Sequence, residues 1–213
     1  MTKPLSAALF CLLVCGAAPA QTYEISVSAG YPRLSSAPLG SLSQEGAKDN
    51  DTKLKGLQSY SARLTRNTRG YYGHELGFSY SRARLETTLR TTQGGKTVTT
   101  VAQDRIDIRQ AHYNFLMYFM PKGERWRPFM TGGGQVQEYG APGIPEWGTG
   151  KSRRFGANYG GGIKLMLFKH ALLRLDVREY IGGKPYDLTF EDPMKTGGLY
   201  RQLEASFGIS IAF

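Results

Sequence analysis

Apolar and polar side chains alternate along most of this chain, and a period of two is typical of a β-strand with two unlike faces. The last segment shows it best, because every second residue from Leu203 to Phe213 is apolar and the residues between them are small or polar. The same alternation recurs from Tyr23 to Tyr31, from Tyr113 to Phe119, from Phe155 to Leu167 and from Leu173 to Val177. Weaker versions run from Lys55 to Thr65, from Tyr71 to Leu85 and from Trp126 to Tyr139. Eight strands are therefore predicted, and no window shows a comparable helical period.

The connections between these segments alternate strictly between long and short. Three are short: Arg66 to Gly70, Pro121 to Arg125, and Lys169 with His170. Four are long: Arg33 to Leu54, Thr87 to Gln103, Gly140 to Arg153, and Gly183 to Gly197. An antiparallel up-and-down sheet would collect the short turns at one end and the long loops at the other. This layout is typical of eight-stranded transmembrane β-barrels of the bacterial outer membrane, whose closure removes free sheet edges from the bilayer.

The two faces of the predicted strands indicate which one meets lipid. An eight-stranded barrel has little internal volume, so small residues and a few paired charges suit its interior. We therefore expect the bulky apolar set to face outward, the reverse of a soluble ligand-binding barrel. Aromatic residues that could form girdles at the membrane surfaces lie along these segments: Tyr23, Tyr31, Trp126, Tyr159, Tyr180 and Phe213. Strand propensity alone also enriches aromatic residues, so this second interpretation stays open.

Several motifs point to a known family. The closing segment Leu203 to Phe213 ends in an aromatic residue, and Arg127-Pro128-Phe129 precedes Gly132 to Gly134. Asn158 to Gly162 and Arg174 to Arg178 complete the pattern. Over almost the whole segment after residue 20, the chain resembles the OmpA/OmpX-like outer membrane protein β-barrel domain family. The resemblance implies an all-β, eight-stranded antiparallel barrel, and it says little about activity because the family has varied roles.

The resemblance also implies how the chain reaches its membrane. In this family a terminal aromatic residue, preceded by apolar residues at every second position, is read by the barrel-assembly machinery. The residues here that match this assembly signal are Phe207, Ile209, Ile211 and Phe213. The competing interpretation is that Phe213 is only an interfacial anchor.

The first 20 residues have the features of a secretory signal peptide. Lys3 gives a positive start, Leu5 to Val14 an apolar core, and Ala18-Pro19-Ala20 a small-x-small cleavage site. We expect cleavage after Ala20, which leaves residues 21–213 as the barrel. A lipoprotein signal acylated at Cys15 is the alternative, although the bulky Val14 disfavours it. Cleavage after Ala20 would remove both cysteines of the chain, so no disulfide framework is expected.

Composition narrows the possible partners. The 213 residues carry a formal net charge of +10, yet the basic residues are scattered and form no tract typical of nucleic-acid binding. Hydrophobic residues make up 40%, without the long apolar runs of a helical membrane protein beyond the N-terminal segment. We expect contact with outer-membrane lipid, no nucleic-acid partner, no cofactor and a monomeric barrel.

Charged residues on the inward face of the predicted strands form a balanced set of four acids and four bases. They are Glu24, Arg63, Glu75, Lys164, Arg174, Asp176, Arg178 and Glu204. Unpaired charges in a narrow lumen would be costly, so we predict a network of interior salt bridges. Arg63 and Glu75 flank a short turn and could meet across it. A gated ion or proton path, or a catalytic dyad, is the functional alternative.

Candidate catalytic and metal-binding residues are few. Of three histidines, His170 falls in a turn and His74 faces lipid, so only His112 points inward. A membrane-embedded lipid A-modifying enzyme with a Ser-His-acid arrangement would need it as the base, but no Ser-x-His or His-x-Ser spacing occurs. The glycine triplets lack the Gly-Lys-Ser/Thr ending of a phosphate loop and favour close strand packing instead. We predict no catalytic, cofactor-binding or metal site.

The sequence therefore predicts a small integral protein of the bacterial outer membrane with a structural or surface-interaction role through its long external loops. A lipid A-modifying enzyme and a narrow channel are the alternatives. The Arg33 to Leu54 loop is polar and is expected to be open to protease from outside the cell. No residue pattern identifies an external ligand.

Overall fold

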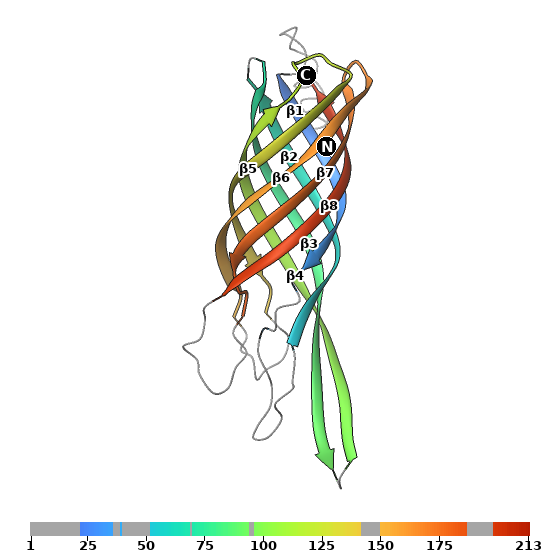
Figure 1. Cartoon of the computed structure of the whole chain (residues 1–213), viewed down its shortest axis with the longest axis vertical. Helices are drawn as coiled ribbons and strands as arrows, with labels where there is room; N and C mark the ends of the chain where they lie inside the picture. The colour runs from blue at the N-terminus through green and yellow to red at the C-terminus, as the bar shows by residue number, and fades with distance from the viewer. Residues whose placement is uncertain are drawn as a thin grey trace, which may run out of the picture.

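The computed structural model describes residues 22–35, 39, 52–68, 70–93, 96–141, 150–186 and 198–213 (Figure 1). The predicted signal peptide, and most of the predicted loop from Arg33 to Leu54, lie outside the described residues. None of the described residues forms a helix long and apolar enough to cross a membrane.

Eight antiparallel strands close into one barrel in chain order, with β1 paired to β8. They are β1 (Tyr23–Leu34), β2 (Thr52–Asn67), β3 (Tyr72–Gln93), β4 (Lys96–Tyr118), β5 (Trp126–Tyr139), β6 (Ser152–Phe168), β7 (Ala171–Gly183) and β8 (Leu199–Ala212). The predicted all-β, eight-stranded up-and-down barrel is confirmed. The three predicted short turns lie at one end, called here the turn end, and the opposite end is the loop end.

One predicted connection is wrong. Residues Thr87 to Gln103 were expected to form a loop, but β3 and β4 continue through most of them and stay paired as far as Gln93 and Lys96. The hairpin therefore projects past the other strands at the loop end, at the bottom of Figure 1. This stretch is rich in threonine and valine, which favour strands, but it lacks apolar and polar alternation. Alternation therefore missed the extension of two predicted strands, which the β-branched residues would have indicated.

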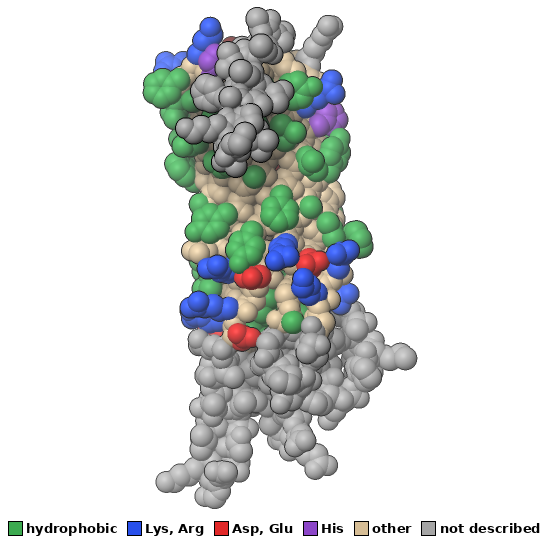
Figure 2. Space-filling model, turned by 180° about the vertical axis from the view of Figure 1, so that it is seen from behind, with side chains coloured by type: hydrophobic (Ala, Val, Ile, Leu, Met, Phe, Trp, Pro, Cys, Tyr) green, Lys and Arg blue, Asp and Glu red, His purple; other side chains and the backbone are tan. Residues whose placement is uncertain are grey.

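The exterior near the turn end is apolar, as expected for a surface that meets lipid. Its outward side chains include Ile25, Val27, Leu64, Leu76, Phe78, Phe115, Met130, Val177, Ile209 and Ile211, all exposed. Apolar side chains are spread over this part of the surface in Figure 2, and charged ones gather beyond it toward the loop end. A large apolar exterior around a polar interior suits a barrel solvated by lipid and not by water.

Most of the predicted girdle residues lie on this exterior. Tyr23, Tyr31, Trp126, Tyr159 and Phe213 are exposed, whereas Tyr180 is only 2% exposed. The assignment of Tyr180 to a girdle is therefore wrong. The reason is parity, because Tyr180 shares its strand face with Arg178 and Asp176, which point into the barrel.

At the loop end the polarity of the barrel wall reverses. On β4, Ile106 and Ile108 are buried inside, while their neighbours Arg105, Asp107 and Arg109 point outward. Ten apolar or aromatic residues form a buried cluster in this part, called here the apolar plug: Leu34, Leu39, Leu54, Ala83, Leu85, Ile106, Ile108, Tyr139, Tyr186 and Tyr200. The expectation of a uniformly small or polar interior is therefore wrong here. A wall with a charged exterior and an apolar interior is the pattern of a barrel in water, so the strands extend beyond the membrane.

Candidate functional site: the barrel interior

A compact cluster of five charged side chains occupies the interior, contributed by β2, β3 and β7. Arg174 and Arg178 each donate to a different oxygen of Glu75, at 2.6 Å in both cases. Both arginines also bond to Asp176, at 2.7 Å from Arg174 Nε and 3.2 Å from Arg178 Nε. The two carboxylates and two guanidinium groups therefore form a closed ring of charge-assisted hydrogen bonds.

Arg63 joins this cluster mainly through β7. Its Nη1 lies 3.4 Å from Asp176 Oδ2 and donates to the Ser28 hydroxyl at 2.9 Å. Its Nε reaches Glu75 only at 4.0 Å, so the predicted meeting across the short turn exists as a long ion pair. Three arginines face two carboxylates, and all five side chains are buried. Removing either carboxylate would leave three buried guanidinium groups to share one counter-ion.

A second interior ion pair lies nearer the turn end. Lys164 on β6 donates to Glu24 on β1 and to the Tyr118 hydroxyl, the latter at 2.9 Å. Asn67 donates to the other Glu24 oxygen at 2.6 Å. Each charge is therefore both paired and hydrogen-bonded, which is the condition for burying it at low cost.

Arg127 is an interior cation that the sequence prediction missed. It is 1% exposed, and its guanidinium carbon lies 3.8 Å from the centre of the Tyr118 ring. Phe129 packs in the same region, with its ring centre 6.0 Å from that of Tyr118. Parity could have found Arg127, because it follows the outward Trp126, but the weak alternation of this segment hid it. The main partner of the Arg127 guanidinium is therefore the Tyr118 ring, through a cation–π contact, and not a carboxylate.

Glu204 stands apart from the rest of the predicted set. It is buried beside the cluster, yet it makes no ion pair within 4 Å with any residue that the structure describes. Gln202 donates to it at 3.4 Å. Gln202 also accepts from Gln137, which donates in turn to Gln110 at 3.0 Å. A layer of amides therefore separates the charged cluster from the apolar plug.

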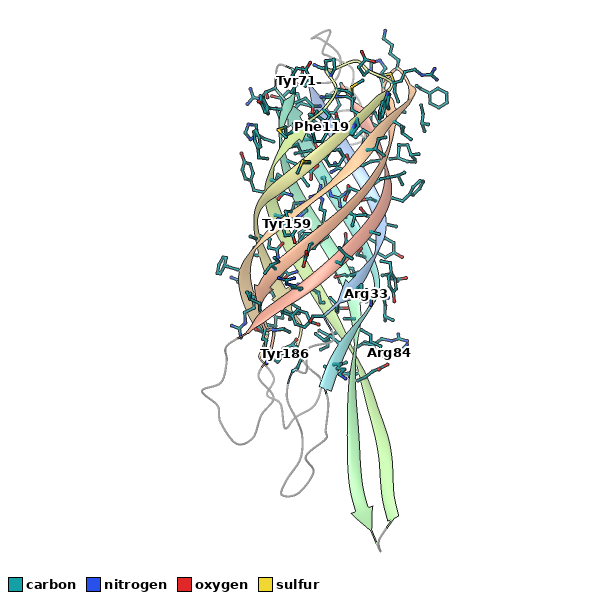
Figure 3. All side chains as sticks on the ribbon, in the orientation of Figure 1. Arg33, Tyr71, Arg84, Phe119, Tyr159 and Tyr186 are labelled. Atoms are coloured by element: carbon teal, nitrogen blue, oxygen red, sulfur yellow. The ribbon has the colours of Figure 1, made fainter. Side chains whose placement is uncertain are left out.

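The structure brings seven of the eight predicted interior charges into ion pairs and leaves Glu204 in the amide layer. Figure 3 shows side chains along the length of the barrel, and the buried polar and apolar ones among them fill its interior. The interior contains, from the turn end, the Glu24–Lys164 pair, the arginine cluster, the amides and the apolar plug. A filled interior of this kind favours a stable wall over an open aqueous path.

His112 lies inside the arginine cluster. Its Nε2 is 3.9 Å from Glu75 Oε1 and 3.4 Å from Arg178 Nη1, and the side chain is 2% exposed. Gly77 opposite leaves the space for its ring, because a Cβ there would lie 2.2 Å from Nε2. Among the described residues, no serine or threonine hydroxyl is hydrogen-bonded to the imidazole. The Ser-His-acid arrangement is therefore not assembled here.

The other two histidines take the positions expected of them. His74 is on the outer surface, where its Nδ1 lies 2.8 Å from the Tyr113 hydroxyl. His170 is in the turn between β6 and β7, with Nδ1 3.0 Å from the carbonyl oxygen of Ala212. Within the described ranges, no three His, Cys, Asp or Glu side chains gather as they would around a metal ion.

Three of the predicted assembly-signal residues lie on the outer face of β8, and Phe213 directly follows that strand. Phe207, Ile209, Ile211 and Phe213 are all exposed toward the surrounding medium. Phe213 lies at the turn end, where its backbone pairs with Tyr23 of β1. The four side chains are thus available to an outside partner in the folded barrel, and their role in assembly stays a prediction.

No protein-family model matches the sequence, and no curated protein matches it. Solved structures do match. The N-terminal β-barrel domain of Pseudomonas aeruginosa OprF is 13% identical, with a TM-score of 0.51 over 92% of this chain and 100% of that one. The outer membrane protein AlkL, solved in lipid bilayers, is 12% identical, with a TM-score of 0.55 over 93% and 94%. Neisserial surface protein A is 12% identical, with a TM-score of 0.47 over 92% and 100%.

The chain has the OmpA/OmpX-type fold of small outer-membrane β-barrels. The proteins that it resembles are bacterial outer-membrane barrels, and its exposed apolar exterior is of the kind that such barrels turn toward lipid. Identities this low show the shared fold alone. The predicted fold is therefore confirmed, and the resemblance stated from the motifs holds at the level of the fold, while the role of the barrel is not decided by it.

Proposed function

We propose that this outer-membrane barrel is a monomeric envelope protein with a structural or surface-interaction role and that its loop end faces outside the cell. The observation that supports this most is the interior, where Arg174 and Arg178 are ion-paired with both Glu75 and Asp176. A site for chemistry or transport would instead need polar groups turned toward a substrate or toward water. The long connections, all at one end, are the surface left for partners.

Membrane fractionation tests the first part of this proposal. We expect the protein in the outer-membrane fraction, with Gln21 as its first residue in N-terminal sequencing. Unheated samples should migrate differently from boiled samples on detergent gels, because closed barrels of this kind resist detergent until heated. Recovery in the soluble fraction, together with a single band before and after boiling, would refute the assignment.

Cysteine labelling on intact cells tests the orientation. If Cys11 and Cys15 leave with the signal peptide, single cysteines can be placed at will. Gly150→Cys puts a thiol at the loop end, and Glu124→Cys puts one in a short turn; both positions are exposed. A membrane-impermeant maleimide should label only the first until the outer membrane is permeabilised. The reverse pattern would show that the loop end faces the periplasm.

The lipid A-modifying enzyme remains the second candidate, and only His112 could serve as its base in the interior. Its contact with Glu75 supplies a carboxylate, which is one part of the required arrangement. Mass spectrometry of lipid A from cells with the wild type, His112→Ala and no protein separates the two candidates. Identical acylation in all three supports the structural role, whereas a change that disappears with His112→Ala would establish the enzyme.

A further inference from the structure

Outward charges at the loop end form a ring around the barrel, called here the basic collar. Its basic members are Arg33, Lys53, Lys55, Arg82, Arg84, Arg105, Arg109, Lys151, Arg153 and Arg201. Its acidic members are Glu86, Asp107, Glu138 and Glu179. Ten bases therefore face four acids. On the face drawn in Figure 2, charged side chains lie just beyond the apolar exterior, and Figure 3 places Arg33 and Arg84 on the loop side of Tyr159.

Three of these basic side chains surround a single acid, Glu138. Arg109 on β4 and Arg153 on β6 lie directly opposite Glu138 in the two neighbouring registers. Arg153 donates to it at 3.0 Å, Lys151 lies 3.6 Å away and Arg109 lies 4.0 Å away. One carboxylate cannot neutralise three cations. The three basic side chains are also more than half exposed, so their remaining donors face outward.

The position of this group relative to the apolar exterior indicates what it meets. One step toward the turn end, the outward residues on the same strands are Ala111, Val136 and Phe155. Phe155 is 77% exposed, which would be costly in water but is favourable against acyl chains. The three cations therefore lie at the boundary between a lipid-facing surface and a water-facing one. A soluble anion would contact the cations and leave the apolar strip on their turn-end side without a partner.

We propose that Arg109, Lys151 and Arg153 bind the phosphate of a lipid in the leaflet at the loop end, while its acyl chains lie along Ala111, Val136 and Phe155. Arginine forms paired hydrogen bonds with phosphate oxygens, and basic residues beside a membrane surface attract anionic lipid. Glu138 holds the three cations together by its own contacts and sets their spacing. The site would fix the depth of the barrel in the bilayer independently of any loop partner.

The test is lipid binding to the full refolded chain in zwitterionic detergent, measured by native mass spectrometry. The probe is lipid A carrying two phosphates, compared with its dephosphorylated form and with its deacylated, water-soluble head group. The triple variant R109Q/K151Q/R153Q removes the proposed site. The matched control R66Q/R125Q/K169Q removes three exposed cations at the turn end. Heat-dependent gel mobility checks that every variant is folded.

We expect the site variant to lose at least tenfold in affinity for phosphorylated lipid A, and the turn-end control to stay within twofold of the wild type. Wild-type binding should weaken as salt is raised and should fall at least tenfold without the phosphates. Equal losses in both triple variants would show attraction by net charge only and would overturn the site. Binding of the deacylated head group as tight as that of the lipid would overturn the assignment of lipid as the occupant.

Discussion

Tyr23 and Phe213 join the two ends of the barrel sheet. Their backbones exchange two hydrogen bonds, from Tyr23 N to Phe213 O at 3.0 Å and from Phe213 N to Tyr23 O at 2.9 Å. Their rings stack on the outer surface with centres 6.2 Å apart and planes at 23°. Phe213 therefore contributes to closing the barrel as well as contacting lipid, so its removal has two separable effects.

Deletion of Phe213 is predicted to reduce the amount of assembled protein in cells much more than the stability of the protein that folds. Loss of its apolar contact costs about 1.5–3 kcal/mol at most. Loss of a recognition signal would instead stop most chains before they insert. Quantitative blots of outer membranes give the first quantity, and urea unfolding of protein refolded in detergent gives the second.

The control for this deletion is Phe119→Ala, which removes another exposed aromatic residue at the turn end. It should lower the unfolding midpoint slightly and leave the membrane level near that of the wild type. Equal membrane levels for the Phe213 deletion and the wild type, with only a lower midpoint, would identify Phe213 as an anchor and not a signal.

Glu75→Gln is predicted to destabilise the barrel by about 3–5 kcal/mol, because Arg174 and Arg178 would lose a buried counter-ion. The matched control is Glu86→Gln, which breaks a 2.6 Å ion pair with Lys55 on the outside and should cost less than about 1 kcal/mol. Urea unfolding in detergent measures both. Similar small losses for the two variants would mean that the interior cluster contributes little.

The wild type is predicted to form no stable open pore in planar bilayers. The arginine cluster and the apolar plug both cross the interior, and an ion would have to displace paired charges and then pass through an apolar region. Single-channel recording of purified protein provides the measurement. Reproducible ion-selective steps at low voltage would support the channel alternative.

The sequence could predict the closed barrel because alternation and connection length are local signals that a membrane wall imposes on every strand. It could also place charges such as Glu24 and Lys164 inside, since parity alone decides the face of a strand. Their pairing could not be predicted, because it depends on register between strands distant in the chain.

Two errors had different causes, a single polarity rule applied to the whole wall and a face assigned from residue type. Ile106 and Ile108 face inward because that part of β4 lies beyond the lipid, where the favourable face for an apolar side chain is the interior. Tyr180 was placed on the outer surface from its residue type, although its parity with Arg178 indicates the interior. The membrane boundary along each strand has to be located before burial can be predicted.

Two adjacent glycines in the Gly132 to Gly134 triplet of β5 are predicted to differ in how well they tolerate alanine. A Cβ at Gly133 would lie 2.0 Å from the Tyr113 carbonyl oxygen on β4, whereas one at Gly132 would find its nearest neighbour at 3.7 Å. Gly133→Ala should therefore cost about 1–3 kcal/mol through forced backbone movement, and Gly132→Ala should be nearly neutral. Urea midpoints of the two refolded variants measure the difference. Equal midpoints would show that β4 and β5 can separate at no cost.

The reversal of wall polarity is tested by one substitution made at two positions on β3. Leu85 is 1% exposed in the apolar plug, and Leu76 is 59% exposed on the lipid-facing surface. Leu85→Ala should cost about 2–5 kcal/mol, because it opens a cavity between packed side chains. Leu76→Ala should cost less, because lipid or detergent chains move into the space that the side chain leaves. Unfolding of both variants in lipid vesicles measures the two losses. An equal or larger loss at Leu76 would mean that the loop-end interior is not a packed core, and that the strands do not extend into water as a second, inverted barrel segment.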